Sequence, residues 1–424
     1  MKRQQHWYIV CLCAVLACSL QGCLGEGASP FQNKNTDKNG RIGINQSDVA
    51  KFQGKIYFTL DRNLYVLDGK LTLTQLTHTL DVRDPAVSPD GKWIAFIIHY
   101  KYYADLVYRS TNPADQTIRT VVTGKGHYFP GGEGANSYYW FAQPTWSADS
   151  SQLLFLSDLQ KDHIWGYLGG AFGSYFLDMQ VFSLPINVTL TATQAIQEAQ
   201  PVAYANFGDG GDRDPSYRPQ HAQQVIYTHY SYDVTGNKQV VQLMLEDSTR
   251  IARPHHPPYH PGINAGPGAG FPGYDPAVAL TPYTPDLVNF QPAFSPDGSL
   301  LAYVRREDTT NRSIYLMPVA EHITGDPDNP AFDPASPDNT QKALQPYVQS
   351  QKLLTQPMLS QPLWSPRGDQ LIFYGYTNTS FDIWLATLTR NAKSGAYSLK
   401  PQNLVQLTQA AGHLDADSRA CWTS

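Results

Sequence analysis

Short apolar runs alternate with polar turns along most of the chain, and one order of residues occurs five times. Each copy has Pro, any residue, and an apolar or aromatic residue that is usually followed by Ser, then a turn and an apolar run. The copies are 85-PAVSPDGKWIAF-96, 144-PTWSADSSQLLF-155, 215-PSYRPQHAQQVIY-227, 292-PAFSPDGSLLAY-303 and 362-PLWSPRGDQLIF-373. Pro-Asp-Gly favours a tight turn, because Pro presets φ and Gly closes the turn. Each copy therefore predicts two antiparallel strands, although the turn has drifted in two of them.

Two further strands are predicted in each unit. A Leu-Thr pair precedes several copies, and another apolar run follows them, as in Ile314–Leu316 and Ile383–Leu385. The pairs are Leu76-Thr77, Leu280-Thr281, Leu354-Thr355 and Leu407-Thr408. Four-stranded units in series are typical of a β-propeller, whose period is roughly 40 to 50 residues. The motif prolines lie 59, 71, 77 and 70 residues apart, so we expect insertions in the loops, where extra length costs little entropy.

The two ends of the chain supply complementary parts of one more unit. The last residues, 418-SRACWTS-424, match the start of a repeat, whereas residues 54–58 match the strand that follows a turn, and residues 63–67 and 73–77 complete the unit. We therefore predict an all-β, six-bladed β-propeller over residues 54–424. Pairing of N- and C-terminal strands closes it and removes open sheet edges.

The repeat resembles that of a known family. Its PxWSPDGxxIAF pattern with the preceding Leu-Thr is similar to the repeat of the TolB-type, WD-like propellers of bacterial envelopes, and the resemblance covers residues from about 54 to 424. It implies a propeller that works in the cell envelope. TolB proteins also carry a separate α/β domain before the propeller, where this chain has a polar segment.

The N-terminus is predicted to be a targeting segment. Met1-Lys2-Arg3 is positively charged, and the apolar run of 12 residues from Ile9 to Leu20, interrupted only by Ser19, falls short of the roughly 20 residues that a membrane span needs. Residues 1–22 are therefore predicted to be a signal peptide. The motif 20-LQGC-23 resembles the bacterial lipobox, which implies lipid attachment at Cys23. The alternative is an ordinary secretory signal in which this Cys occurs by chance.

The cysteines and the segment after Cys23 agree with export. Three of the five cysteines lie within the signal peptide, which leaves Cys23 and Cys421, so an acylated Cys23 excludes a disulfide framework. Residues 23–53 are polar and are predicted to be a flexible tether. We expect an exported protein, anchored to the cell membrane or the outer membrane and facing the periplasm or the extracellular space.

Composition argues against several functions. Charged residues make up 16% of the chain and the net charge is −5, against roughly 25% charged residues in ordinary domains. No Lys/Arg run is present, so we expect no nucleic-acid partner. The sequence also lacks the Gly-X-Ser-X-Gly, HExxH and P-loop motifs. Trp146, Trp364 and Trp422 share one repeat position, where we expect packing between blades.

The remaining candidate chemistry is weak. His255, His256 and His260 could offer imidazoles to a metal, but no nearby acid or thiol completes the set. Residues 268–273 spell a dinucleotide fingerprint without the strand and helix that it needs. The acidic stretch Asp209–Asp214 could hold calcium but lacks EF-hand spacing. We therefore predict no catalytic residue, cofactor or metal site, and name only Cys23 as a site of lipid attachment.

Long insertions leave two interpretations open: recognition of peptides or sugars by Tyr in Gly-rich loops, or solvated spacers on the propeller rim. They are 124-GKGHYFPGGEGANSYYWF-141, 166-GYLGGAFGSYFLD-178, 205-NFGDGGDRD-213 and 324-TGDPDNPAFDPASPDNTQ-341.

The predicted function is non-catalytic binding. The chain would be a scaffold lipoprotein that meets the bilayer through acylated Cys23 and an envelope protein, a peptide or a glycan through its propeller loops. The alternative is a propeller enzyme, a polysaccharide lyase or hydrolase, with a site in the central channel. Arg83, Asp84, Arg213 and Asp214, which begin predicted inner strands, are available for it. A purely architectural role in the assembly of a membrane complex is a third possibility.

Overall fold

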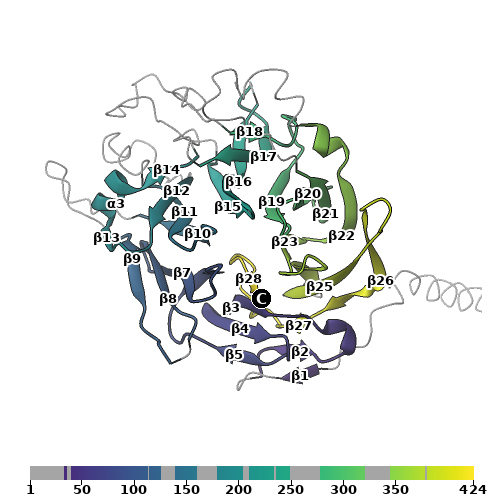
Figure 1. Ribbon diagram of the computed structural model, residues 1–424, viewed down its shortest axis with the longest axis horizontal. Coiled ribbons are helices and arrows are strands. Elements are labelled where there is room, and N and C mark those ends of the chain that lie inside the picture. The colour runs from purple at the N-terminus through teal and green to yellow at the C-terminus, as the bar shows by residue number, and fades with distance from the viewer. Residues whose placement is uncertain are drawn as a thin grey trace, which may run out of the picture.

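The computed structural model shows six sheets arranged around a central axis (Figure 1). The structure describes residues 33–35, 40–112, 114–125, 139–159, 179–203, 210–233, 235–248, 277–319, 344–377 and 380–424. Cys23, the three histidines from His255 to His260 and most residues of the long insertions lie outside these ranges.

Each sheet is a blade of antiparallel strands, numbered here from the blade that holds both chain ends. Blade 1 consists of β28 (Cys421–Thr423), β3 (Lys55–Leu60), β4 (Asn63–Asp68) and β5 (Leu73–Gln75). Blade 2 consists of β6 (Val82–Val87), β7 (Trp93–His99), β8 (Ala104–Ser110) and β9 (Arg119–Thr123). Blade 3 consists of β10 (Phe141–Trp146), β11 (Gln152–Ser157), β12 (Gln180–Pro185) and β14 (Gln200–Pro201). Blade 4 consists of β15 (Asp212–Arg218), β16 (His221–Tyr232), β17 (Gln239–Asp247) and β18 (Val278–Ala279). Blade 5 consists of β19 (Asn289–Phe294), β20 (Leu300–Arg306), β21 (Asn311–Pro318) and β22 (Gln351–Pro357). Blade 6 consists of β23 (Ser360–Trp364), β24 (Gln370–Thr377), β25 (Ser380–Arg390) and β26 (Tyr397–Gln406). The predicted fold class, an all-β six-bladed propeller, is confirmed.

Blade 3 also braces its neighbour. The connection between its last two strands contains β13 (Leu190–Thr191), which pairs in parallel with β9 of blade 2, and α3 (Ala192–Glu198). Thr191 and Gln194 form a capping box at the start of α3, which satisfies backbone N–H groups that the helix leaves open. This makes blade 2 a five-stranded sheet.

The motif turn owes its shape to the Ser after the aromatic position. In blade 5 the Ser295 hydroxyl donates to Asp297 Oδ1 at 2.5 Å and accepts from the backbone N–H of Leu300 at 3.0 Å. Blades 2 and 3 repeat both bonds, through Ser88 and Ser147. In blade 4, Arg218 replaces this Ser.

Both chain ends build blade 1, as predicted. Cys421, Trp422 and Thr423 pair with Tyr57, Ile56 and Lys55 in antiparallel register. Gly54 enters β3 with φ of +85°, and a Cβ there would lie 1.9 Å from the carbonyl oxygen of Thr423, so this junction requires Gly.

The motif tryptophans lie between blades, as expected. The indole N–H of Trp146 donates to the carbonyl of Ala86 in blade 2 at 2.8 Å, and that of Trp364 donates to the carbonyl of Ala293 in blade 5 at 3.1 Å. Trp422 donates to the carbonyl of Gln53 at 2.8 Å. All three rings are at most 7% exposed, so their role is packing.

The Thr of the Leu-Thr pairs bonds to the third strand of its blade. The hydroxyls of Thr77, Thr281 and Thr408 accept from the backbone N–H groups of Leu64, Leu243 and Ile383 at 2.8, 3.0 and 2.9 Å. A hydroxyl thus replaces a backbone partner at the end of the ladder, which explains why this residue type returns in several blades.

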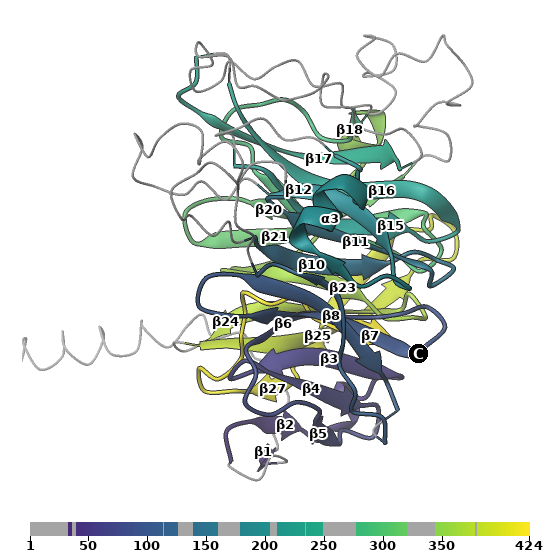
Figure 2. The same ribbon diagram turned by 90° about the vertical axis from the view of Figure 1, so that its left-hand side faces the viewer.

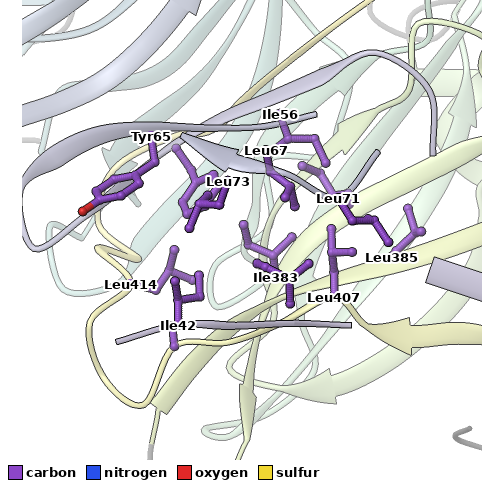
Figure 3. Close-up of a cluster of buried hydrophobic side chains, with 14 of the residues drawn as sticks. Ile42, Ile56, Tyr65, Leu67, Leu71, Leu73, Ile383, Leu385, Leu407 and Leu414 are labelled. Atoms are coloured by element: carbon purple, nitrogen blue, oxygen red, sulfur yellow. The ribbon is translucent and has the colours of Figure 1, made fainter. Parts of the chain in front are cut away.

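The segment before the propeller is packed and not free over its last part. Strand β2 (Gly43–Asn45) pairs with β1 (Asn33–Asn35) and with β27 (Thr408–Gln409), and η1 (Asp48–Ala50) follows. Ile42 and Ile44 are at most 1% exposed and join a core between blades 1 and 6 that includes Leu67 and Ile383 (Figure 3). The flexible tether predicted for residues 23–53 therefore does not extend over residues 42–52, because their few apolar side chains complete this core.

Figure 2 shows the same small sheet at the edge of blade 1, beside β4 and β5. None of the helices in the described residues is long and apolar enough to cross a membrane.

Candidate binding site at the central channel

The residue before each motif proline bends its inner strand. Asp84, Gln143, Asp214, Gln291 and Gln361 have φ between +50° and +57°, and the ladder register shifts at each of them. Such β-bulges re-aim side chains, and a positive φ costs on the order of 1–2 kcal/mol for a residue with a Cβ. Five repetitions of this cost indicate that the surrounding contacts fix the conformation.

Hydrogen bonds join these five residues into a belt around the channel. Asp84 Oδ2 accepts from the backbone N–H of Gln143 at 2.9 Å, and Gln143 Oε1 accepts from that of Asp214 at 2.6 Å. Gln291 Oε1 accepts from the backbone N–H of Gln361 at 2.8 Å. Each side chain thus satisfies the displaced backbone of the next blade.

Three further links complete the belt. The Thr228 hydroxyl donates to Asp214 Oδ2 at 3.1 Å and accepts from the backbone N–H of Gln291 at 3.1 Å. The Gln361 amide donates to the carbonyl of Ala416 at 3.2 Å. Arg419 in blade 1 donates its backbone N–H to Asp84 Oδ1 at 2.8 Å. The belt therefore runs through all six blades, whose inner strands lie nearest the centre in Figure 1.

The belt separates two hollows. The larger, about 450 Å³, lies where the inner strands begin, and we call it the entry mouth. Its lining includes Arg213, Tyr230, Phe290, Arg312, Phe381 and Asp417. The smaller, about 110 Å³, is lined by Tyr217, Phe294 and Leu363 among others. Asp214, Gln291 and Gln361 line both hollows, so the belt is the floor of the entry mouth.

Asp84, an expected enzyme candidate, is a belt residue. It is 5% exposed, and burial raises the pKa of its carboxyl, although the backbone N–H groups of Arg419 and Gln143 oppose that rise. Both of its oxygens accept backbone N–H groups. Asp214 is likewise engaged by Gln143 and Thr228.

Arg83, a second expected candidate, lies within an ion-pair network on the blade 1 side of the channel. Its guanidinium contacts Asp81 Oδ1 at 3.0 Å and Asp417 Oδ1 at 2.5 Å. Burial lowers the pKa of Arg83, but the carboxylates of Asp417 and Asp81 outweigh it and raise the pKa overall. Its charge is therefore balanced within the protein.

Arg213, the remaining candidate, lies at the opposite wall in blade 4. Its guanidinium donates to the carbonyl of Asp212 at 2.6 Å, and it lines the entry mouth beside Tyr230. Burial, and then the charge of Asp214, raise the pKa of Tyr230 to about 12, against the opposing effect of Arg213, Arg312 and Arg306. Tyr230 is therefore a neutral phenol at physiological pH, and the charges of three arginines act on it.

The described acids of the stretch Asp209–Asp214, which was considered for calcium, have different partners. Asp209 lies outside the described residues, Asp212 Oδ1 lies 2.8 Å from His229 Nδ1, and Asp214 belongs to the belt. Among the described residues, no group of three His, Cys, Asp or Glu side chains is placed to hold a metal ion.

Sequence analysis missed the belt and Arg312. The belt has a signal in the sequence, because Asp or Gln precedes the motif proline in all five copies. Asp is one of the residue types enriched at positive φ, because its short side chain can form local hydrogen bonds. Arg312 has none of its own, because its position opposite Arg306 depends on the register of a hairpin.

Comparisons with known proteins were made for the sequence and for the fold. No family model matches the chain, and no curated protein matches it. Similar solved structures include TolB from Acinetobacter baumannii (14% identity, 87% of this chain and 66% of that chain, TM-score 0.48) and an oligogalacturonate lyase in complex with manganese (13%, 88% and 85%, 0.41). A putative TolB from Agrobacterium tumefaciens gives 13%, 87% and 96%, with a TM-score of 0.40.

This chain thus spans just under two thirds of the length of the Acinetobacter protein. The propeller assignment rests on the six sheets described above and not on these similarities. The structural neighbours of this six-bladed β-propeller include TolB proteins.

Proposed function

We propose that this chain is an exported, lipid-anchored propeller that binds an envelope protein, a peptide or a glycan at its entry mouth and catalyses no reaction on it. The observation that carries the proposal is the entry mouth itself, a hollow of about 450 Å³ at one end of the channel. It has a fixed hydrogen-bonded floor and walls that combine aromatic and charged side chains, which is typical of ligand sites.

The state of the polar groups favours binding over catalysis. Asp84 and Asp214 each accept hydrogen bonds from the belt, so removing a proton from a substrate would require breaking these bonds. Tyr230, with a pKa of about 12, is a poor base at neutral pH because an effective general base has a pKa near the working pH.

The proposed anchor is supported by the sequence alone. The motif 20-LQGC-23 after an apolar run of 12 residues supports acylation of Cys23. Because residues 42–52 pack between blades 1 and 6, a lipid at Cys23 would be attached to the propeller at the seam of these two blades.

Affinity purification of the full-length protein from solubilised native membranes tests the proposal, with bound molecules identified by mass spectrometry. We expect one stoichiometric partner, present with the wild type and reduced when Cys23→Ser releases the chain from the membrane. Ala416→Trp, which fills the entry mouth, should abolish capture.

Arg367→Trp is the matched control, because Arg367 lies at a turn of blade 6 away from the entry mouth. Equal thermal melting of both Trp variants would show that they fold. Capture that survives Ala416→Trp would refute the entry mouth as the binding site. Turnover of a polysaccharide by the purified protein, lost in Asp84→Asn or Asp214→Asn, would establish the enzymatic alternative instead.

A further inference from the structure

Arg312 lines the blade 5 side of the entry mouth, and an arginine of the adjacent strand, Arg306, lies directly opposite it. Arg306 ends β20 and Arg312 lies near the start of β21, and the two residues are direct partners in the ladder. Like charges placed directly opposite on a sheet are destabilising. The pair therefore needs either a compensating anion or a function.

The protein's own carboxylates do not compensate this pair. Within the described residues, no carboxylate lies in ion-pair distance of Arg306 or Arg312. The two acids in the same hairpin have other partners. Glu307 contacts Lys352 Nζ at 2.9 Å, and Asp308 accepts from the backbone N–H of Asn311 at 2.6 Å.

Arg312 is oriented for binding by an aromatic ring. Its guanidinium carbon lies 5.5 Å from the centre of the Phe290 ring, which holds the side chain by a cation–π contact. Both residues line the entry mouth. Burial, and then the charge of Arg306, lower the pKa of Arg312, which is the physical sign of two cations held close together. Arginine nevertheless stays charged at physiological pH.

The charges of the entry mouth are thus divided between its two sides. On the blade 1 side, Asp417 is bound by Arg83. On the blade 4 and 5 side, Arg213 and Arg312 line the entry mouth together with Tyr230, and the charges of Arg213, Arg312 and Arg306 oppose the rise in the pKa of Tyr230. A ligand with an anionic group gains most on the second side, where a guanidinium can offer a bidentate hydrogen-bonded pair.

We propose that Arg312, with Arg306 beside it, binds a carboxylate carried by a polypeptide ligand. This inference rests on the proposed function, because it names the chemistry that the same site recognises. A carboxylate fits better than a phosphate because Asp214 and Asp417 also line the entry mouth, and they repel a group of charge near −2 more strongly than one of charge −1.

The lining favours a polypeptide over a glycan. Phe290 and Phe381 supply apolar surface beside the arginines. In the floor, both ends of the Gln143 amide and the Oε1 of Gln291 already bond within the belt. A sugar would bring many hydroxyls that find few open partners there, and each buried polar group left without a hydrogen-bond partner is destabilising. An acidic side chain or free C-terminus next to an apolar residue fits this surface.

Binding of short fluorescent peptides to the purified full-length protein tests the inference. The probes are Gly-Phe-Glu-Phe-Gly, the same peptide with Gln, the same peptide with phosphoserine in place of Glu, a glucuronate oligomer and inorganic phosphate. Fluorescence anisotropy for the peptides, and competition for the other probes, give the affinities. We expect the Glu peptide to bind about tenfold more tightly than the Gln peptide, with an affinity that falls as salt rises.

The preference for Glu should disappear in Arg312→Gln and fall severalfold in Arg306→Gln. Arg312→Lys keeps the charge but loses the bidentate geometry, so it should keep only part of the preference. Arg367→Gln, at the other end of the propeller, should bind as the wild type does, and melting temperatures verify that each variant folds.

Several results would overturn the inference: equal binding of Glu and Gln peptides, binding unaffected by Arg312→Gln, tighter binding of the phosphopeptide, phosphate or glucuronate, or no binding of any probe. Failure of the inference is distinguishable from failure of the proposed function. A partner captured from membranes that is lost with Ala416→Trp but kept with Arg312→Gln would retain the entry mouth as a binding site and exclude the arginine pair as its carboxylate receptor.

Discussion

Two regions of the propeller differ in how their charged side chains are paired. One is the seam between blades 1 and 6, and the other is the wall of the entry mouth at blades 4 and 5. At the seam, apolar side chains from the preceding segment and both blades form one core, and Arg41 is paired with Asp61 at 2.7 Å. At the wall, Arg306 and Arg312 face each other without a carboxylate partner among the described residues. Burial and ion pairing stabilise the seam, whereas the wall holds two like charges together, where we propose that a ligand binds.

The largest effect that this comparison predicts is at the seam. Ile44 is fully buried, so Ile44→Ala should lower the free energy of unfolding by about 2–5 kcal/mol through lost burial and a residual cavity. Guanidinium unfolding measures this change. Val348→Ala is the control, because Val348 is 85% exposed and should change stability by less than about 0.5 kcal/mol. Equal stability of both variants would mean that the segment before blade 1 does not stabilise the seam.

A buried acid at the seam gives the second prediction, a dependence of stability on pH. Burial raises the pKa of Asp382 from 3.8 to about 6, against the opposing hydrogen bonds from Ala410, Thr408 and Gln406. Because the folded-state pKa exceeds the unfolded value, the folded protein binds more protons between these pH values. Stability should therefore rise as pH falls from about 6 to about 4, by on the order of 2–3 kcal/mol from this residue.

Asp382→Asn isolates that contribution, because an amide does not titrate. The difference in unfolding free energy between wild type and variant, measured from pH 4 to 8, should carry the slope. A constant difference across this range would show that Asp382 has the same pKa folded and unfolded.

The smallest effect contrasts two arginines of the channel. Arg83→Gln removes contacts to Asp81 and Asp417 and should cost about 1 kcal/mol, because the partners are partly exposed. Arg306→Gln removes a like-charge pair and should leave stability unchanged or raise it by about 0.2–1 kcal/mol. Urea unfolding at low and high salt separates the two, since salt should weaken both effects. A loss of stability in Arg306→Gln would mean that the wall is not a site of repulsion.

Local chemistry explains what could be predicted. The motif turns, the tryptophans between blades and the closure by residues 418–424 all follow from residue types whose roles depend on near neighbours, and the structure confirms them. One copy of the repeat, in blade 4, departs from the motif at the Ser position. Arg218, in the place of the motif Ser, is 2% exposed and donates to the carbonyl of Gly298 in blade 5 at 2.8 Å, so it joins two blades instead of anchoring a turn.

The packing of residues 42–52 could not be predicted in the same way. The segment has only a few apolar residues without a sustained period, so it is typical of a tether by composition. Ile42 and Ile44 become core residues because blades 1 and 6 leave space that these side chains fill.

The sequence by itself determined the number of blades, the way the ring closes and the position of each inner strand, because each copy of the repeat forms the same local interactions. Only the tertiary structure decided which residues meet at the channel. Asp84 and Gln143 are 59 residues apart in the chain, and Arg306 and Arg312 become partners through hairpin register. Such contacts depend on how the blades pack around one axis, and residue types alone do not show which distant residues will meet there.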